Sequence, residues 1–400
     1  MSRVRIPTID DLLAAPGGVR GARVLVRSDL NVPLRDGRVS DDTRLRAALP
    51  TLRRLLAAGA RVVLCSHLGR PKGSPRSELS LRPVAEALSG LLGRKLGFCP
   101  SSVGAEALSA AEALGDGELL LLENLRFDSR EEANDPAFAK ALAELADVYV
   151  NDAFGTAHRA HASTAGVAAE IPRRAAGDLM RAELRHLLAV REPKRPLLCF
   201  LGGAKVSDKL AVLEALAPHA DVLAIGGAMA YTFLRARGEA TGNSLVEEDR
   251  IADAARVVAA AERADRRLLL PSDHIVVERI EPDAPTRAVT EIPDGAIAVD
   301  IGPETAERYA RETRSAKTIF WNGPMGIFEM PAFARGTLAV ARAVAVAPGH
   351  TVVGGGDSLA AINQAGVGGE IDHLSTGGGA SLEYIQGLAL PGVTALTENR

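Results

Sequence analysis

Short, almost continuously apolar runs alternate with amphipathic stretches along the whole chain. A strand with one face in water would alternate apolar and polar residues, so these runs indicate parallel strands buried on both faces. Helical periodicity fills the intervals between them. The predicted strands are 22–28, 60–67, 118–124, 147–152, 195–202, 221–227, 296–302, 317–323 and 350–356, and the predicted helices include 82–93, 136–146, 205–217, 249–264 and 332–346.

The domain organisation follows from length and from this alternation. A chain of 400 residues is too long for one ordinary core. Alternating β and α elements predict an α/β fold with two doubly wound parallel-sheet (Rossmann-like) lobes joined by a helix. We expect a first lobe at 1–176, an inter-lobe helix and hinge at 177–196, and a second lobe from 197 on.

Composition narrows the class of protein. No run of about 20 apolar residues predicts a membrane span, and the start has no secretory apolar region, so we expect a cytoplasmic protein. A net charge of −3 gives no reason to expect a nucleic acid as partner. The three cysteines, Cys65, Cys99 and Cys199, lie in apolar surroundings and are interpreted as buried thiols.

Glycine clusters follow several predicted strands of the second half, at 202–203, 226–227, 354–356 and 377–379. Ligands of open α/β sheets bind at the carboxyl ends of strands, where glycine allows close backbone approach and a helix N-terminus attracts phosphate. The pattern favours a nucleotide site, although single tight turns would also use glycine. Neither a Walker-A motif nor G-x-G-x-x-G is present, since Leu359 stands where a third glycine is needed.

Lysine and aspartate accompany these glycines. Most basic residues are Arg, yet Lys205 and Lys209 lie four residues apart beside Gly202–Gly203. On a helix both would share one face and could meet a phosphate, or simply be solvated. Asp357 follows three glycines and either binds Mg²⁺ or caps a helix, while Ser358 could provide the cap instead.

Polar residues also stand at strand ends in the first half. Arginines there suit bidentate contacts to a phosphate or carboxylate, so they predict a site for a small anion. His158 and His161 have metal-ligand spacing, but no Cys or carboxylate cluster completes such a site, and a structural role is favoured. The candidates for the anion site are Asp29, Asn31, Arg44, His67, Arg70, Arg126 and Arg159.

Long stretches of the chain resemble phosphoglycerate kinase, in that family's order and over nearly the whole length. They are RSDLNVP, SHLGRPKG, LLLENLRF, NDAFGTAHRAHAST, LGGAKVSDKL, IGGAMAYTFL, KTIFWNGPMGIFE, VVGGGDS and STGGGASLEY. The resemblance implies reversible phosphoryl transfer between 1,3-bisphosphoglycerate and ADP, giving 3-phosphoglycerate and ATP. It also implies Mg²⁺ with the nucleotide, a monomer, and no nucleic acid or membrane as partner.

The resemblance further implies a role for each matching residue. The lobe 1–176 would bind 3-phosphoglycerate through Asp29, Asn31, Arg44, His67, Leu68, Gly69, Arg70, Arg126 and Arg159. The lobe 197–386 would bind the nucleotide through Lys205, Lys209, Gly302, Asn322, Glu329, Gly355, Gly356, Asp357 and Ser358, with Asp357 as the metal ligand. Arg44, Lys209, Gly378 and Gly379 would stabilise the phosphoryl group in flight, and the segment 387–400 would return to the first lobe.

The chain departs from the family pattern in a few places. Ser28 stands where a larger apolar residue is usual, Leu30 where Phe is common, and the inter-lobe segment around Asp178, Arg181 and Ala182 is divergent. A substrate carboxylate is ionised at neutral pH, so the reaction needs no general base. Two other classes remain alternatives: a nicotinamide-dependent oxidoreductase, which the missing glycine fingerprint disfavours, and a non-catalytic nucleotide-binding protein.

Overall fold

The structure, a computed structural model, describes residues 5–397. The chain divides into two compact α/β units, which confirms the predicted fold class. One unit comprises residues up to Leu184 together with those from Ala389 on, and the other is Arg185–Leu388. The division falls within helix α8 (Asp178–Arg191), inside the segment expected to join the lobes.

The first unit is built on a parallel six-stranded sheet with the order β5-β6-β4-β1-β7-β8. Its strands are β1 (Arg23–Ser28), β4 (Arg61–Cys65), β5 (Gly97–Cys99), β6 (Leu119–Leu122), β7 (Val148–Asp152) and β8 (Arg174–Ala176), with a small hairpin of β2 (Leu34–Arg35) and β3 (Arg38–Val39). Its helices are α1 (Ile9–Ala14), α2 (Thr43–Ala57), α3 (Arg82–Leu92), α4 (Ala105–Glu112), α5 (Ser129–Glu132), α6 (Pro136–Ala143), α7 (Val167–Glu170) and α16 (Pro391–Thr394).

Burial on both faces explains why these strands are apolar without alternation. Val24 and Val26 of β1 join a core cluster with Leu52 of α2 and Leu88 of α3 on one face of the sheet. Leu25, between them, points to the opposite face and is equally buried.

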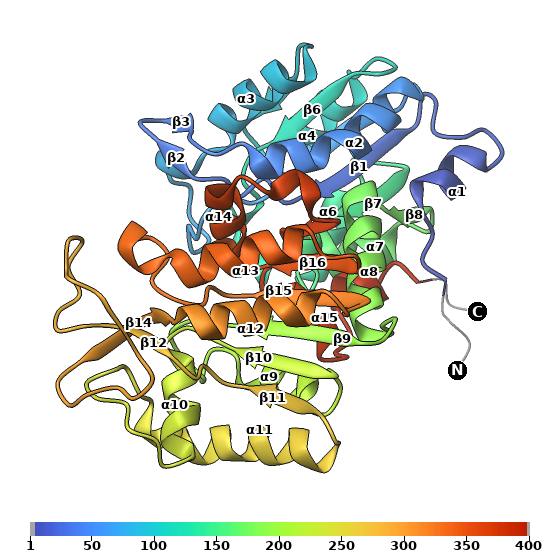
Figure 1. The fold of residues 1–400 in the computed structure, drawn as a ribbon. Coiled ribbons are helices and arrows are strands. Elements are labelled where there is room, and N and C mark those ends of the chain that lie inside the picture. The colour runs from blue at the N-terminus through green and yellow to red at the C-terminus, as the bar shows by residue number, and fades with distance from the viewer. Residues whose placement is uncertain (1–4, 398–400) are drawn as a thin grey trace. The chain divides into compact units, whose positions relative to one another are not determined.

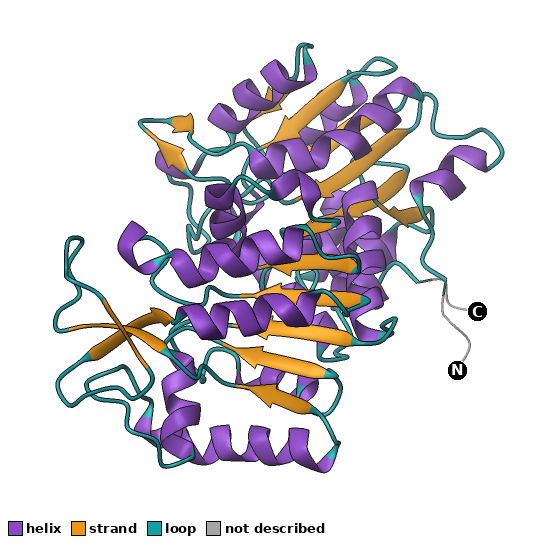
Figure 2. Ribbon diagram, in the orientation of Figure 1, coloured by secondary structure: helices purple, strands orange, loops and turns teal. Residues whose placement is uncertain are grey.

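The second unit contains a parallel six-stranded sheet with the order β11-β10-β9-β15-β16-β17 (Figures 1 and 2). Its strands are β9 (Leu197–Leu201), β10 (Val222–Ile225), β11 (Arg267–Leu269), β15 (Thr318–Asn322), β16 (His350–Gly354) and β17 (His373–Ser375). Its helices are α9 (Leu210–Leu216), α10 (Met229–Ala236), α11 (Ile251–Arg263), α12 (Pro303–Thr313), α13 (Arg335–Ala345), α14 (Gly356–Ala365) and α15 (Gly379–Ile385). Helices α12 and α13 pack side by side over one face of this sheet (Figure 1).

One predicted strand lies outside the parallel sheets. The run 296–302 forms β14 (Ile297–Ile301), which pairs antiparallel with β12 (His274–Val277) in a side sheet of order β13-β12-β14, where β13 is Arg287–Val289. The expectation of a parallel strand was wrong here because apolar burial comes from a different partner. Val299 packs with Val277 and Phe333 in a separate small core.

The predicted helix at 205–217 is also shorter than expected, because α9 begins only at Leu210. Val206 is fully buried, and the backbone and hydroxyl of Ser207 both donate to Glu247, at 3.0 and 2.6 Å. These contacts hold the segment in an irregular turn. Lys205 and Lys209 therefore do not share a helix face, which corrects the sequence interpretation.

The residues after Leu388 pack on the first unit. Gly392 N donates to Ala157 O at 2.9 Å, and Asn151 Nδ2 donates to Gly392 O at 3.1 Å. Arg174 donates to Thr397 O at 3.0 Å. Among residues 5–397, none of the helices is long and apolar enough to cross a membrane.

Candidate functional site

The first unit has a cavity of about 220 Å³ at the carboxyl ends of its strands, which we call the cationic cavity. Parallel strands bring residues that are distant in the sequence to this edge. Eight of the nine residues expected to bind an anion line it, namely Asp29, Asn31, Arg44, His67, Gly69, Arg70, Arg126 and Arg159. Gly155, Thr156 and His158 complete the lining.

The ninth residue, Leu68, is placed differently. Its side chain belongs to the hydrophobic core, and its backbone N–H and C=O are both bonded to the amide of Asn124. Leu68 therefore fixes the loop after β4, while its neighbours His67 and Gly69 line the cavity.

One wall of the cationic cavity is held by hydrogen bonds between its own residues. Arg44, in the first turn of α2, donates to Asp29 Oδ1 at 3.1 Å and to Asn31 O at 2.9 Å. Asn31 Oδ1 in turn accepts from Gly69 N at 2.9 Å. The wall therefore orders Arg44 before any ligand enters.

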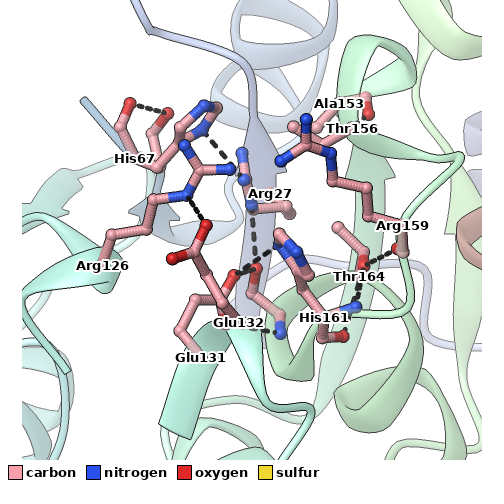
Figure 3. Close-up of polar contacts among 12 residues, drawn as sticks. Arg27, His67, Arg126, Glu131, Glu132, Ala153, Thr156, Arg159, His161 and Thr164 are labelled. Atoms are coloured by element: carbon pink, nitrogen blue, oxygen red, sulfur yellow. Dashed lines mark hydrogen bonds and ion pairs between the residues drawn. The ribbon is translucent and has the colours of Figure 1, made fainter. Parts of the chain in front are cut away.

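Arg126, another arginine of the cationic cavity, is also held by contacts with neighbouring residues. It donates to Gly69 O at 2.9 Å and forms an ion pair of 3.1 Å with Glu132 (Figure 3). Burial is the main reason why the pKa of Arg126 is lowered, although a guanidinium stays charged at any physiological pH. A buried cation with spare N–H donors is well suited to an anionic ligand.

Sequence reasoning missed Arg27, Gly155, Thr156 and His158. Arg27 is fully buried in β1 and contacts His67 (Figure 3). It begins the stretch RSDLNVP, but that stretch alone does not show that the side chain is buried. His158 lines the cavity and its Nε2 accepts from Arg159 Nε at 3.2 Å.

The two histidines with metal-ligand spacing, His158 and His161, are placed differently, and only His158 lines the cationic cavity. His161 is buried, and burial together with nearby arginines lowers its pKa to about 4. Within residues 5–397, no group of three or more His, Cys, Asp or Glu side chains could hold a metal ion. The three cysteines are free and buried, as expected.

The second unit has a cavity of about 300 Å³ at the carboxyl ends of β9, β10 and β15, which we call the glycine-lined cavity. Gly203, Gly227 and the segment 324–327 form part of its wall. Leu245 and Ile280 also line it and are 48% and 45% exposed, which is unusual for such residues. Exposed apolar walls of this kind suit a flat ring such as a nucleobase.

The glycines of this unit have a packing role that the sequence did not reveal. A Cβ on Gly202 would lie 2.0 Å from Pro324 O, and one on Gly227 would lie 2.5 Å from Gly203 O. Gly227 and Gly323 also have positive φ, at 67° and 95°. The loops after β9, β10 and β15 therefore cross in backbone contact, and only glycine fits at the crossing. This loop crossing brings Gly203 and Gly227 to the cavity.

Beside this cavity lies a chain of polar contacts that positions a lysine. Lys209 donates to Asn322 Oδ1, and Asn322 Nδ2 donates to Gly354 O at 2.7 Å. Burial lowers the pKa of Lys209, and the charge of Asp357 partly offsets that shift. Asn322 thus presents a partly desolvated ammonium group, which attracts a phosphate strongly.

The loop after β16 also lies beside the glycine-lined cavity. Gly355, not Ser358, is the N-cap residue of α14. The hydroxyl of Ser358 accepts from Gly323 N at 2.6 Å, so it joins the β15 and β16 loops. Asp357 is exposed and lines the glycine-lined cavity.

Three more of the residues predicted to bind the nucleotide are placed in different surroundings. Glu329 is exposed and lines the glycine-lined cavity. Lys205 is exposed in the turn before α9. Gly302 lines a different cavity behind the side sheet, where a Cβ would meet Asp273 at 2.2 Å, so it has a packing role.

Two further glycines lie at the start of α15. Gly378 has a φ of 54° and is the N-cap residue, and Gly379 begins the helix. A Cβ on Gly378 would have open space around it, so packing alone does not require glycine there. Both stand at the same edge of the sheet as the loop after β16, because β16 and β17 are parallel neighbours.

A cationic cavity on one α/β unit, and a glycine-lined cavity beside a half-buried lysine on another, are typical of a two-unit kinase. Residues 14–388 match the family model for phosphoglycerate kinase. The phosphoglycerate kinase of Moorella thermoacetica is 58% identical over 379 residues, covering 94% of this chain and 96% of the relative. That of Rubrobacter xylanophilus is 55% identical over 383 residues, covering 95% and 96%.

Solved structures agree. The structure of phosphoglycerate kinase from Coxiella burnetii has a TM-score of 0.89 and 39% identity, covering 98% of this chain and 99% of that one. That from Pyrococcus horikoshii has a TM-score of 0.81 and 34% identity, covering 94% and 96%. The chain therefore belongs to the phosphoglycerate kinase family.

Proposed function

We propose that this chain transfers a phosphoryl group reversibly between 1,3-bisphosphoglycerate and ADP, giving 3-phosphoglycerate and ATP. Family membership identifies the enzyme class as a phosphotransferase with a carboxyl acceptor. The observation that carries the proposal is the pairing of four arginines that line one cavity, with Arg44 and Arg126 held by hydrogen bonds, and the held lysine Lys209 in the other unit.

The cationic cavity is proposed to bind the phosphoglycerate. Its arginines would neutralise the phosphate and carboxylate charges, while Asp29 and Asn31, which line the same cavity, would accept from a hydroxyl. The carboxylate that attacks the terminal phosphate of ATP is already ionised, so no side chain has to remove a proton. This fits a cavity rich in cations that contains no obvious carboxylate–histidine base pair.

The glycine-lined cavity is proposed to bind the nucleotide. Leu245 and Ile280 would cover the base, with Glu329 at the ribose. Lys209, Arg44 and the amides of Gly378 and Gly379 would stabilise the charge on the transferring phosphoryl group, with Lys205 and the loop Gly355–Ser358 at the other phosphates.

Asp357 fits a magnesium ion that arrives with the nucleotide. It is an exposed carboxylate beside the cavity, and it belongs to no three-ligand cluster among residues 5–397. A lone carboxylate suits Mg²⁺, which takes its other ligands from phosphates and water. Bound there, the ion would neutralise phosphate charge; Asp357 would orient it.

Transfer requires reacting atoms within about 3–3.5 Å. The proposed sites belong to different units, so we infer that hinge bending at residues flanking α8 brings them together during the reaction. Small-angle scattering should give a smaller radius of gyration with both substrates than with either one. We also propose that the enzyme acts as a cytoplasmic monomer, and a scattering mass of 41.8 kDa, that of one chain, at both low and high concentration would support the monomer.

The function is tested by measuring ADP release that depends on both ATP and 3-phosphoglycerate. Release with both substrates supports the proposal. Nucleotide binding without turnover would indicate a non-catalytic relative, and hydride transfer to a nicotinamide cofactor would indicate an oxidoreductase.

A further inference from the structure

Arg27 is a fully buried cation in contact with His67, one of the two histidines that line the cationic cavity. Its Nε donates to Ser163 Oγ at 2.9 Å, and one terminal nitrogen donates to the backbone oxygen of Ser28. The other terminal nitrogen lies 3.1 Å from His67 Nδ1 (Figure 3). The guanidinium is thus anchored at two points and presents a third N–H to the imidazole.

The chemistry of the two side chains decides which nitrogen of His67 carries the proton. A guanidinium has only donors and does not lose its charge in proteins. Nδ1 must therefore accept, and in a neutral imidazole the proton then stands on Nε2. A flipped ring would place a C–H against the Arg27 donor and leave that buried N–H without an acceptor, at a cost of about 1–3 kcal/mol.

A buried carboxylate keeps Arg27 in place. Ser163 Oγ donates to Glu131 Oε1 at 2.5 Å, and Ser163 N donates to Glu131 Oε2 at 2.9 Å. Burial raises the pKa of Glu131, while the charge of Arg27 is the largest influence lowering it. Arg27, Ser163 and Glu131 thus form a relay in which the serine hydroxyl links the cation to the anion.

We propose that Arg27 is a positioning residue that holds His67 as the neutral tautomer with its proton on Nε2. The cationic cavity then meets its ligand with four arginine cations and one uncharged N–H donor. The identity of the ligand rests on the proposed function, whereas the state of the ring does not.

The surroundings of His67 oppose a positive charge on every side. Arg27, Arg126, Arg44 and His161 face it from β1, the loop after β6, α2 and the loop after β7. Burial is the main cause that lowers the pKa of His67 well below its ordinary value, and the charges of Arg27, Arg126 and Arg44 add to it. An uncharged N–H donor can orient a carboxylate without protonating it, so the attacking group keeps its full charge.

The tautomer can be read directly by long-range proton–nitrogen NMR of the full-length protein labelled with ¹⁵N. His67→Gln identifies the His67 signals among those of the eight histidines. We expect wild-type His67 to carry its proton on Nε2 and not to titrate between about pH 5.5 and 8. A proton on Nδ1, or a titration in that range, would overturn the proposal, and this spectrum needs no variant that might fail to fold.

Arg27→Met tests the cause. Without the guanidinium, His67 should show both tautomers and should titrate nearer to the ordinary histidine pKa of about 6.5. His274 is the matched control, because it is buried in the other unit with a pKa of about 4. Unchanged His67 signals in folded Arg27→Met would show that another group fixes the ring.

Kinetics give a second readout. Arg27→Met should raise the KM for 3-phosphoglycerate about tenfold and lower kcat less, since the lost order concerns a binding donor. If the tautomer is as described but 3-phosphoglycerate supports no turnover, the proposed function fails and the inference about Arg27 stands. If turnover occurs while Nδ1 carries the proton, the inference fails alone.

Discussion

Lys209→Ala removes the one lysine that the structure holds against the proposed nucleotide site. The ammonium group is bonded to Asn322, which is itself fixed by Gly354 O at 2.7 Å. Burial has already removed part of the water around Lys209, as the direction of its pKa shift indicates. A charge held in advance of the reaction costs little reorganisation when charge develops on the phosphoryl group.

The size of the effect follows from this setting. A hydrogen bond to a charged group contributes about 1.5–3 kcal/mol, and loss of one preorganised donor lowers kcat by about 10²–10³-fold. We therefore expect Lys209→Ala to reduce kcat by about 10²-fold or more, with little change in nucleotide Kd. The wild-type rate should also fall at alkaline pH below the ordinary lysine range, because a lowered pKa lets the ammonium group lose its proton sooner.

Lys317→Ala is the matched control. It removes the same charge from the same unit, but Lys317 is exposed and precedes β15, whose far end holds Asn322. Five strand residues separate the ends by about 16 Å, beyond the screening length of about 8 Å at physiological salt. Steady-state kinetics and isothermal titration with ADP, on variants of matched thermal stability, give kcat and Kd separately.

Two results would refute this reasoning. A Lys209→Ala enzyme with normal kcat and a raised Kd would show that the lysine binds the ground state only. Equal losses in Lys209→Ala and Lys317→Ala would show that only the total charge of the unit matters.

Three further predictions concern the metal and the packing. Asp357→Asn should weaken binding of Mg-ADP far more than that of metal-free ADP, whereas equal losses in titration calorimetry would argue for a structural role of Asp357. Ser28→Ala should raise the free energy of unfolding in urea by about 1 kcal/mol, because Ser28 Oγ is buried without a hydrogen-bond partner among residues 5–397; Ser163→Ala, which loses two bonds, should lower it. Gly227→Ala should destabilise the protein by about 2 kcal/mol or more, through its positive φ and its clash with Gly203 O, while Gly369→Ala, which has open space, should be nearly neutral by the same measurement.

Strand type and most candidate residues could be predicted because both depend on local pattern. Continuous apolar runs such as 22–28 and 60–67 became buried parallel strands, and topology then gathered their terminal residues at one edge. The run 296–302 was wrongly predicted to be a parallel strand, because a strand buried in the antiparallel side sheet is as apolar as one buried in a parallel sheet.

The remaining features of the fold and of the candidate site depend on tertiary contacts, which a local sequence pattern does not reveal. The turn that separates Lys205 from Lys209 depends on Glu247, which lies 40 residues further along the chain. The burial of Arg27 becomes clear only when Ser163, which lies 136 residues further along the chain, accepts its hydrogen bond. The exposed rim of Leu245 and Ile280 was equally invisible, because exposure of an apolar residue leaves no mark on its neighbours in the sequence.

The loop crossing at Gly202, Gly227 and Gly323 has a consequence for engineering this family. Three loops that touch backbone to backbone cannot be lengthened or remodelled one at a time, since each is the wall against which another is built. A search for altered nucleotide preference should therefore leave the crossing untouched and vary Leu245 and Ile280, whose side chains line the cavity and are about half exposed. For the same reason, a relative needs these glycines in order to fold. Their presence in its sequence is therefore not evidence that the relative is an active enzyme.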